Sequence, residues 1–200
     1  YNFHMIEVIN SLKKKNIFIK YDSYGDGEQL LSLNEKVNNL NLSDLITFHP
    51  AISYNKFKST ISDSLMFIGA GTALIEASAC GIPALIGIEN EEYPLTYGFL
   101  HNTETYSYQE QQLSFEKYKI EDFILKLKNQ NEESYREECV KAQRRANNFS
   151  IEITIEDFIK MTNNSISYDF SLNKLQLTLI TISMFLNKII CPKTNYSKRL

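Results

Sequence analysis

The segment from Asp63 to Ile86 (DSLMFIGAGTALIEASACGIPALI) contains the residues best suited to chemistry. A run of apolar residues ends in the glycines Gly69 and Gly71, and a helical pattern begins near Thr72. Glycine lets a phosphate approach the backbone closely. The free N–H groups and the dipole at the start of a helix then stabilise the negative charge of that phosphate. The segment therefore predicts a phosphate-binding turn.

Two side chains beside this turn add polar groups. Thr72 supplies a hydroxyl, and the Glu76 carboxylate, about one helical turn further on, can accept hydrogen bonds from the two hydroxyls of a ribose. A tight strand-to-helix turn that needs glycine only for its backbone, with Glu76 in solvent, fits the same spacing equally well. Spacing alone leaves both interpretations open.

Short apolar runs and helical patterns alternate through the first half of the chain. Strands are predicted at 17–19, 45–48, 64–68 and 84–88. Helices are predicted at 1–15, 28–40, 54–61 and from the glycine turn to Cys80, where Gly81 and Pro83 form a stop signal. Continuous apolar strands with short connections favour an α/β fold, a Rossmann-like parallel sheet with helices on both faces. Such sheets bind ligands beyond the carboxyl ends of their strands, where the glycine turn lies.

The second half of the chain carries a weaker pattern. A long loop with a short strand at Phe99 is expected after Glu89, followed by helices at 119–128, 132–148 and 154–161. We assign residues 1–165 to one Rossmann-like domain and residues 166–200 to a C-terminal helical tail.

The tail has one apolar helical face, formed by Leu175, Leu179, Ile182, Leu186 and Ile189. Alternating leucines leave a strand possible at its beginning. Its uncharged stretch, 175–187, is shorter than the roughly 20 residues that a bilayer requires. The tail is expected either to dock on another domain or, through its basic flanks, to lie on an anionic membrane surface.

The composition excludes several classes of protein. A hydrophobic fraction of 43% and a charged fraction of 22% are ordinary for a globular domain, and the net charge of −3 lacks the basic footprint of a nucleic-acid binder. Three cysteines, Cys80, Cys139 and Cys191, show no paired spacing, which argues against a disulfide framework or a zinc site. No signal-peptide pattern follows Tyr1, and we expect a piece of a longer cytoplasmic protein.

The glycine-turn segment and the segments around it resemble a known family. GAGTALIEASACGIPAL is similar to the donor-binding segment of GT-B glycosyltransferases, with its glycine turn, a helix beginning Glu-Ala, and G-x-P. Upstream, IFIKYDSYGDGEQLLSL and LNLSDLITFHPAIS resemble the strand, glycine turn and helix, and the L-x-x-x-V-x-F-x-G stretch, of glycosyltransferase family 4. Gly98-Phe99-Leu100 and FEKYKIEDFILKLKN stand where that family has a G-x-L turn and its following helix. The resemblance covers about residues 1–160 and implies the C-terminal half of a GT-B fold.

The sequence departs from family 4 in two ways: one glutamate is missing, and the loop ahead of the glycines is short. That family has a further Glu eight residues before the one that matches Glu76, and Ile68 stands there in this chain. From Asp63 to Pro83 the chain instead resembles, without a gap, the murein-precursor N-acetylglucosaminyltransferases, which have a similarly short glycine loop and manage without that Glu. In that alignment, one glycine of this chain stands one position away from the glycine of the family pattern. The resemblance therefore leaves retaining or inverting stereochemistry open.

The resemblance implies a role for each residue that matches. The diphosphate of a UDP- or GDP-linked sugar would be bound by backbone and hydroxyl donors of Gly69, Ala70, Gly71 and Thr72. Glu76 would hold the ribose, and His49 lies where related enzymes place backbone against the base, although a lone histidine is more often structural. The acceptor site and any catalytic base belong to an N-terminal domain in these enzymes, so no catalytic residue is assigned. No metal or cofactor is expected, because backbone donors and a helix dipole can stabilise a leaving diphosphate.

The implied function is transfer of a sugar from a nucleotide sugar to a glycan or lipid-linked acceptor, in cell-surface polysaccharide biosynthesis. The enzyme would be hexosyltransferase-like, cytoplasmic or peripheral on the inner face of the membrane, and would need an N-terminal domain or partner subunit. Two alternatives stay open: a GT-B sugar-nucleotide epimerase, and a non-catalytic nucleotide-binding subunit.

Overall fold

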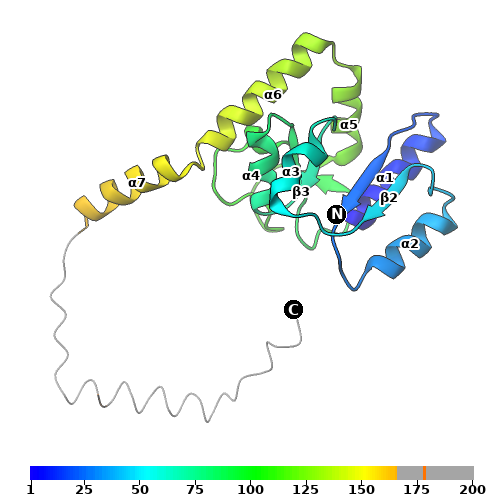
Figure 1. The fold of residues 1–200 in the computed structure, drawn as a ribbon, viewed down its shortest axis with the longest axis horizontal. Coiled ribbons are helices and arrows are strands. Elements are labelled where there is room, and N and C mark those ends of the chain that lie inside the picture. Colours follow the sequence, from blue (N-terminus) through cyan, green and yellow to red (C-terminus); the bar gives the residue numbers. More distant parts are fainter. Residues whose placement is uncertain (166–177, 179–200) are drawn as a thin grey trace. The chain divides into compact units, whose positions relative to one another are not determined.

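Helices and short parallel strands alternate through the first 86 residues, as their apolar patterns predict (Figure 1). The helices are α1 (Asn2–Lys14), α2 (Leu30–Asn39), α3 (Tyr54–Ile61) and α4 (Thr72–Ala79). The strands are β1 (Tyr21–Tyr24), β2 (Ile46–His49), β3 (Phe67–Gly69) and β4 (Ala84–Ile86). This computed structural model describes residues 1–165 and Thr178, so the tail predicted at 166–200 otherwise lies outside the described residues.

The four strands form two parallel pairs. β1 pairs with β2, with Tyr21 opposite Ile46, and β3 pairs with β4, with Phe67 opposite Ala84. The prediction of parallel strands joined by helices is therefore confirmed. Within the described part of the chain the two pairs remain separate two-stranded sheets.

The first predicted strand is wrong by four residues. Asn16, at φ 59°, ends the turn after α1, and residues 17–20 run on without a strand partner within the described residues. Pairing begins only at Tyr21, whose N–H donates to the Leu45 carbonyl 2.8 Å away, because β2 lies alongside from that point. Ile17 and Ile19 still pack against the core, which explains their apolar character.

The second half of the chain is more irregular. β5 (Leu95–Thr96) lies inside the region predicted as a long loop, and it pairs antiparallel with β6 (Tyr118–Lys119), which overlaps the first residue of the helix predicted at 119–128. The strand predicted at Phe99 is reduced to a single bridge to Leu85, and a 3-10 helix, η1 (Leu100–Asn102), follows it. The three later helices are confirmed as α5 (Ile120–Asn129), α6 (Glu132–Asn147) and α7 (Ile151–Asn163).

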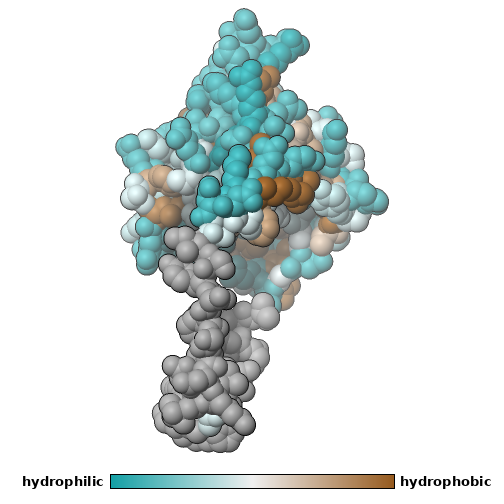
Figure 2. All heavy atoms as spheres, turned by 90° about the vertical axis from the view of Figure 1, so that its left-hand side faces the viewer, coloured by the Kyte–Doolittle hydropathy of each residue, from teal (hydrophilic) through white to brown (hydrophobic). Residues whose placement is uncertain are grey.

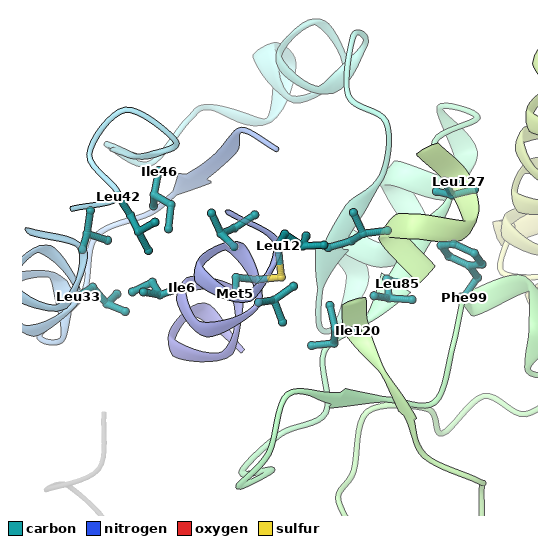
Figure 3. Close-up of a cluster of buried hydrophobic side chains, with 14 residues drawn as sticks. Met5, Ile6, Leu12, Leu33, Leu42, Ile46, Leu85, Phe99, Ile120 and Leu127 are labelled. Atoms are coloured by element: carbon teal, nitrogen blue, oxygen red, sulfur yellow. The ribbon is translucent and has the colours of Figure 1, made fainter. Parts of the chain in front are cut away.

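Helix α1 fills the centre of the larger core cluster (Figure 3). Its side chains lie between two groups of buried residues. One group comes from α2, β2 and the turn between them: Leu33, Leu42 and Ile46. The other comes from β4, the residue before η1, and α5: Leu85, Phe99, Ile120 and Leu127. Burial of α1 therefore joins both halves of this core.

A second core cluster fixes helix α4, which carries the glycine turn at its start. Leu74 and Ala77 are fully buried against β4 and the segment leading to η1. The helix ends at Gly81, at φ 82°, where the Ile82 N–H donates to the Ala77 carbonyl 3.1 Å away. This is the glycine stop that the sequence predicts. Helix α4 packs mainly against α6.

Residues Tyr1–Ile155 form one compact unit. This unit includes the first residues of α7, which ends at Asn163. Helix α7 has no buried residue and exposes the apolar side chains of Ile151, Ile155, Phe158, Ile159 and Met161. Figure 2 shows a largely hydrophilic face, on which hydrophobic residues are confined to small areas. None of the helices in the described residues is long and apolar enough to cross a bilayer.

Candidate functional site

The glycine turn joins the end of β3 to the start of α4. The Gly69 carbonyl accepts a hydrogen bond from the Gly87 N–H 2.7 Å away, which holds the end of β3 against β4. Gly71 has φ 65° and ψ −153°, a backbone region that only glycine adopts readily. A Cβ atom at Gly71 would meet no heavy atom closer than 4.0 Å, so backbone conformation rather than crowding requires glycine here. Thr72, exposed, is the first helical residue.

The peptide groups of Gly71 are covered by the loop between η1 and β6. The Gly71 N–H donates to Oε1 of Gln109, and the Gly71 carbonyl accepts from the Tyr108 hydroxyl 3.1 Å away. The sequence analysis missed both residues. The only available signal was the run YSYQEQQ inside a predicted long loop, and nothing in that run indicates which part of the fold it contacts.

Glu76 lies one turn further along α4 and lines a cavity of about 590 Å³. The remaining walls come from α4, α6 and the residues after α6: Ile75, Ala79, Gln143, Arg144, Ala146, Asn147, Phe149 and Ser150. The half-buried Glu76 carboxylate makes no hydrogen bond or ion pair to any described residue. It is therefore available to a ligand that enters the cavity.

The cavity combines apolar and polar walls. Ile75, Ala79 and Phe149 supply apolar surface, while Arg144 and Asn147 on α6 supply hydrogen-bond donors to the same cavity as the Glu76 acceptor. A ribose or hexose ring presents both C–H faces and hydroxyl groups, so this arrangement suits it. Sequence reasoning missed the α6 residues, because their pattern is that of an ordinary surface helix.

Phe149 connects this cavity to the glycine turn. Its ring packs edge-on against Tyr108, with centroids 6.2 Å apart, and lies 4.7 Å from the guanidinium carbon of Arg145. Nη2 of Arg145 donates to the Thr105 carbonyl 2.6 Å away, which fixes the loop that carries Tyr108. Burial lowers the pKa of Arg145, although a guanidinium remains charged at any physiological pH. A positive charge therefore stays beside the loop.

His49, the remaining predicted site residue, is the last residue of β2 in the other parallel pair. Its Nε2 lies 2.7 Å from Oδ1 of Asp22, and its ring stacks on Tyr24 with centroids 4.6 Å apart. These contacts fix the orientation of the imidazole at a strand end. The structure thus groups Gly69, Ala70, Gly71, Thr72 and Glu76 on one strand–turn–helix unit and places His49 on a different strand pair.

Metal ligands are not clustered in the described residues: no group of three or more His, Cys, Asp or Glu side chains could hold a metal ion there. Cys80 and Cys139 are free thiols in this part of the chain. Cys80 packs against the second core cluster as a small apolar residue.

Comparison with known proteins extends this description. Residues 2–93 match the family model described as Glycosyl transferases group 1. The fold is similar to the crystal structure of an S. aureus TarM mutant in complex with Fondaparinux, alpha-GlcNAc-glycerol and UDP, with a TM-score of 0.55 and 20% sequence identity. That match covers 80% of this chain and 32% of TarM, so the chain spans about a third of TarM's length. No curated protein sequence matches. The fold is thus similar to that of GT-B glycosyltransferases, as the sequence resemblance implies.

Proposed function

We propose that this chain is the donor-binding domain of a glycosyltransferase, which transfers a sugar from a nucleotide sugar to an acceptor hydroxyl. The observation that carries the proposal is the β3–glycine turn–α4 unit beside a cavity walled by Glu76. The turn and Glu76 both lie inside the segment, residues 2–93, that matches the glycosyl transferases group 1 model.

The glycine turn is suited to a diphosphate. The first N–H groups of α4 have no partner within the helix, and the helix dipole adds positive potential at its start. The first turn of α4 contains no acidic residue that would cancel this potential. The exposed Thr72 hydroxyl supplies a further donor. A diphosphate carried by a nucleotide would therefore be stabilised at this position.

The position of the diphosphate determines where the ribose, the sugar and the base of the nucleotide sugar would lie. Glu76, on the same helix, would accept hydrogen bonds from the ribose hydroxyls, while the apolar cavity wall packs against the sugar ring. His49 and Tyr24 form a stacked pair at the ends of β2 and β1, which would lie against the base. UDP is bound in the TarM structure, and a UDP-linked sugar is accordingly our first choice of donor, with GDP as the alternative.

In the transfer step, the acceptor oxygen forms a bond to the anomeric carbon of the sugar. The bond between that carbon and the phosphate oxygen breaks, and negative charge collects on the leaving nucleoside diphosphate. The backbone donors of the turn and the start of α4 stabilise this charge without requiring a metal. The proton of the acceptor passes to a base that we do not assign to this chain. By analogy the acceptor is a glycan or a lipid-linked glycan of the cell surface.

Calorimetric titration with UDP and GDP tests the donor site. Saturable binding of one nucleotide, followed by transfer of its sugar in the full-length protein, is the expected result. Failure to bind either nucleotide would overturn the proposal. Binding without turnover would indicate a nucleotide-binding subunit, and interconversion of free sugar nucleotides would indicate an epimerase.

A further inference from the structure

We propose that Gln109 is an internal stand-in for phosphate, which closes the glycine turn in the ligand-free protein and is displaced by the diphosphate of the donor. This proposal rests on the function proposed above. It concerns a residue outside the segment that matches the glycosyl transferases group 1 model.

The Gln109 side chain binds a backbone N–H that the diphosphate of the nucleotide sugar would also need. The Gly71 N–H at the start of α4 is one of the backbone donors proposed for the diphosphate, and Oε1 of Gln109 accepts its hydrogen bond. On the other side of the same residue, the Gly71 carbonyl accepts from Tyr108. A diphosphate can therefore bind the Gly71 N–H only after the Gln109 side chain has left.

The backbone on which Gln109 sits is firmly held. The Glu89 N–H donates to the Gln109 carbonyl 2.8 Å away, and the Tyr97 hydroxyl lies 2.9 Å from each of the carbonyl oxygens of Glu110 and Gln111. Tyr108 is only 7% exposed. Burial raises the pKa of Tyr108, so its hydroxyl stays protonated and continues to donate to Gly71. The Gln109 side chain, by contrast, is half-buried, and its one hydrogen bond to a described residue is the one to the Gly71 N–H, so its release breaks no other hydrogen bond there.

Electrostatics decides which acceptor binds. The amide oxygen of Gln109 is neutral overall, whereas a phosphate oxygen carries formal charge and accepts a stronger hydrogen bond at a helix start. Gln109 therefore satisfies the Gly71 N–H in the free protein but yields to the donor. The closed contact lowers the apparent affinity for the donor, because only the open fraction is competent to bind. A carboxylate at the same position would compete much more strongly.

Substitutions at Gln109 test this proposal by calorimetric titration with UDP and with inorganic pyrophosphate. Gln109→Ala frees the Gly71 N–H and should tighten binding by about three- to tenfold, the equivalent of one ordinary hydrogen bond. Gln109→Glu should weaken binding about tenfold or more, through a charged competitor and repulsion of the diphosphate. Gln112→Ala, an exposed glutamine three residues along the same loop, is the matched control and should bind as the wild type does.

A ligand-free measurement separates this proposal from the proposed function. Hydrogen exchange at the Gly71 amide, followed by NMR, should be slow in the wild type and in Gln112→Ala, and faster in Gln109→Ala. Unchanged exchange in Gln109→Ala would overturn the proposal without reference to any ligand. If UDP binds but Gln109→Ala has equal or weaker affinity, displacement is wrong and the donor site stands. If no variant binds a nucleotide or pyrophosphate, the donor site itself is wrong, and displacement fails with it.

Discussion

Gly71 is the residue at which backbone geometry and the proposed chemistry coincide. Its φ of 65° with ψ of −153° requires glycine, while the space around it would accommodate a side chain. Replacement should therefore strain the backbone and place atoms where a phosphate must approach, without creating a clash in the core. The two consequences can be measured separately.

We predict that Gly71→Val abolishes binding of UDP or GDP and lowers the free energy of unfolding by about 1–3 kcal/mol, the usual cost of such a backbone conformation in a residue other than glycine. Thermal unfolding should remain cooperative. Gly27→Val is the matched control, because Gly27 has no positive φ and a Cβ there would meet no atom within 4 Å. Normal nucleotide binding by Gly71→Val would show that the turn has only a structural role.

Glu76 can be tested independently of the glycine turn. Its carboxylate has no partner among the described residues, so Glu76→Gln should leave the free energy of unfolding nearly unchanged. If the carboxylate accepts the ribose hydroxyls, the same substitution should weaken nucleotide binding by about 1–3 kcal/mol, the range for hydrogen bonds to a charged group. Glu137→Gln, at an exposed position on α6, is the control. Equal affinity of Glu76→Gln and the wild type would remove Glu76 from the ribose site.

Local signals determined which helices and strands could be predicted from the sequence. The apolar spacing of α3 predicts its observed bounds, Tyr54–Ile61. Gly81 ends α4 because glycine readily adopts the positive φ that follows a helix. The start of β1 at Tyr21 could not be predicted, because a strand is defined by its partner, and β2 lies alongside only from Tyr21 onward. Ile17 and Ile19 pack against the core without joining a ladder.

The candidate site likewise has one part that the local sequence predicts and another part that it does not. Its strand, glycine turn and helix are continuous in sequence, so their arrangement could be predicted from residues 67–79 alone. The cavity beside Glu76 needs α6, and the cover over Gly71 needs Tyr108 and Gln109, nearly 40 residues further along the chain. Such contacts depend on packing between distant segments, and no spacing in the sequence encodes them.

A buried pair joins η1 to α6 and makes stability depend on pH. Nε2 of His101 lies 2.8 Å from Oε2 of Glu138, and Nζ of Lys141 lies 3.1 Å from Oε1 of Glu138. Burial lowers the pKa of His101 below its usual 6.5, partly opposed by the Glu138 carboxylate. Burial alone would raise the pKa of Glu138, but hydrogen bonds from Lys141 and His101, with the charge of Lys126, outweigh it and lower that pKa. Both groups therefore bind protons less readily in the folded state.

Folding stability contributed by these two groups is present above their unfolded pKa values and is lost as the pH falls. We predict that the free energy of unfolding in urea decreases between about pH 7.5 and about pH 5.5, and that His101→Gln reduces this decrease. His4, whose pKa is also lowered by burial, acts in the same direction, so His4→Gln is measured in parallel. An identical pH dependence in His101→Gln and the wild type would contradict the assignment.

The larger core cluster is organised around α1 rather than around a continuous sheet. The two parallel strand pairs are not joined by a ladder within the described residues, yet buried residues of α2, β2, β4 and α5 all belong to the cluster that α1 fills (Figure 3). The packing of α1 therefore couples the glycine-turn side of the unit to the side that carries His49.

The coupling through α1 can be measured with a single substitution in that helix. Leu12 on α1 is fully buried, so Leu12→Ala should lower the free energy of unfolding by about 2–5 kcal/mol through lost burial and the cavity that remains. Leu31→Ala removes the same atoms from a side chain that is 78% exposed and should change stability by less than about 0.5 kcal/mol. Because α1 contacts both groups of core residues, fluorescence of the tyrosines and far-UV circular dichroism should report one shared urea transition for Leu12→Ala. Two separate transitions would mean that the halves of this core unfold independently, and that α1 does not join them.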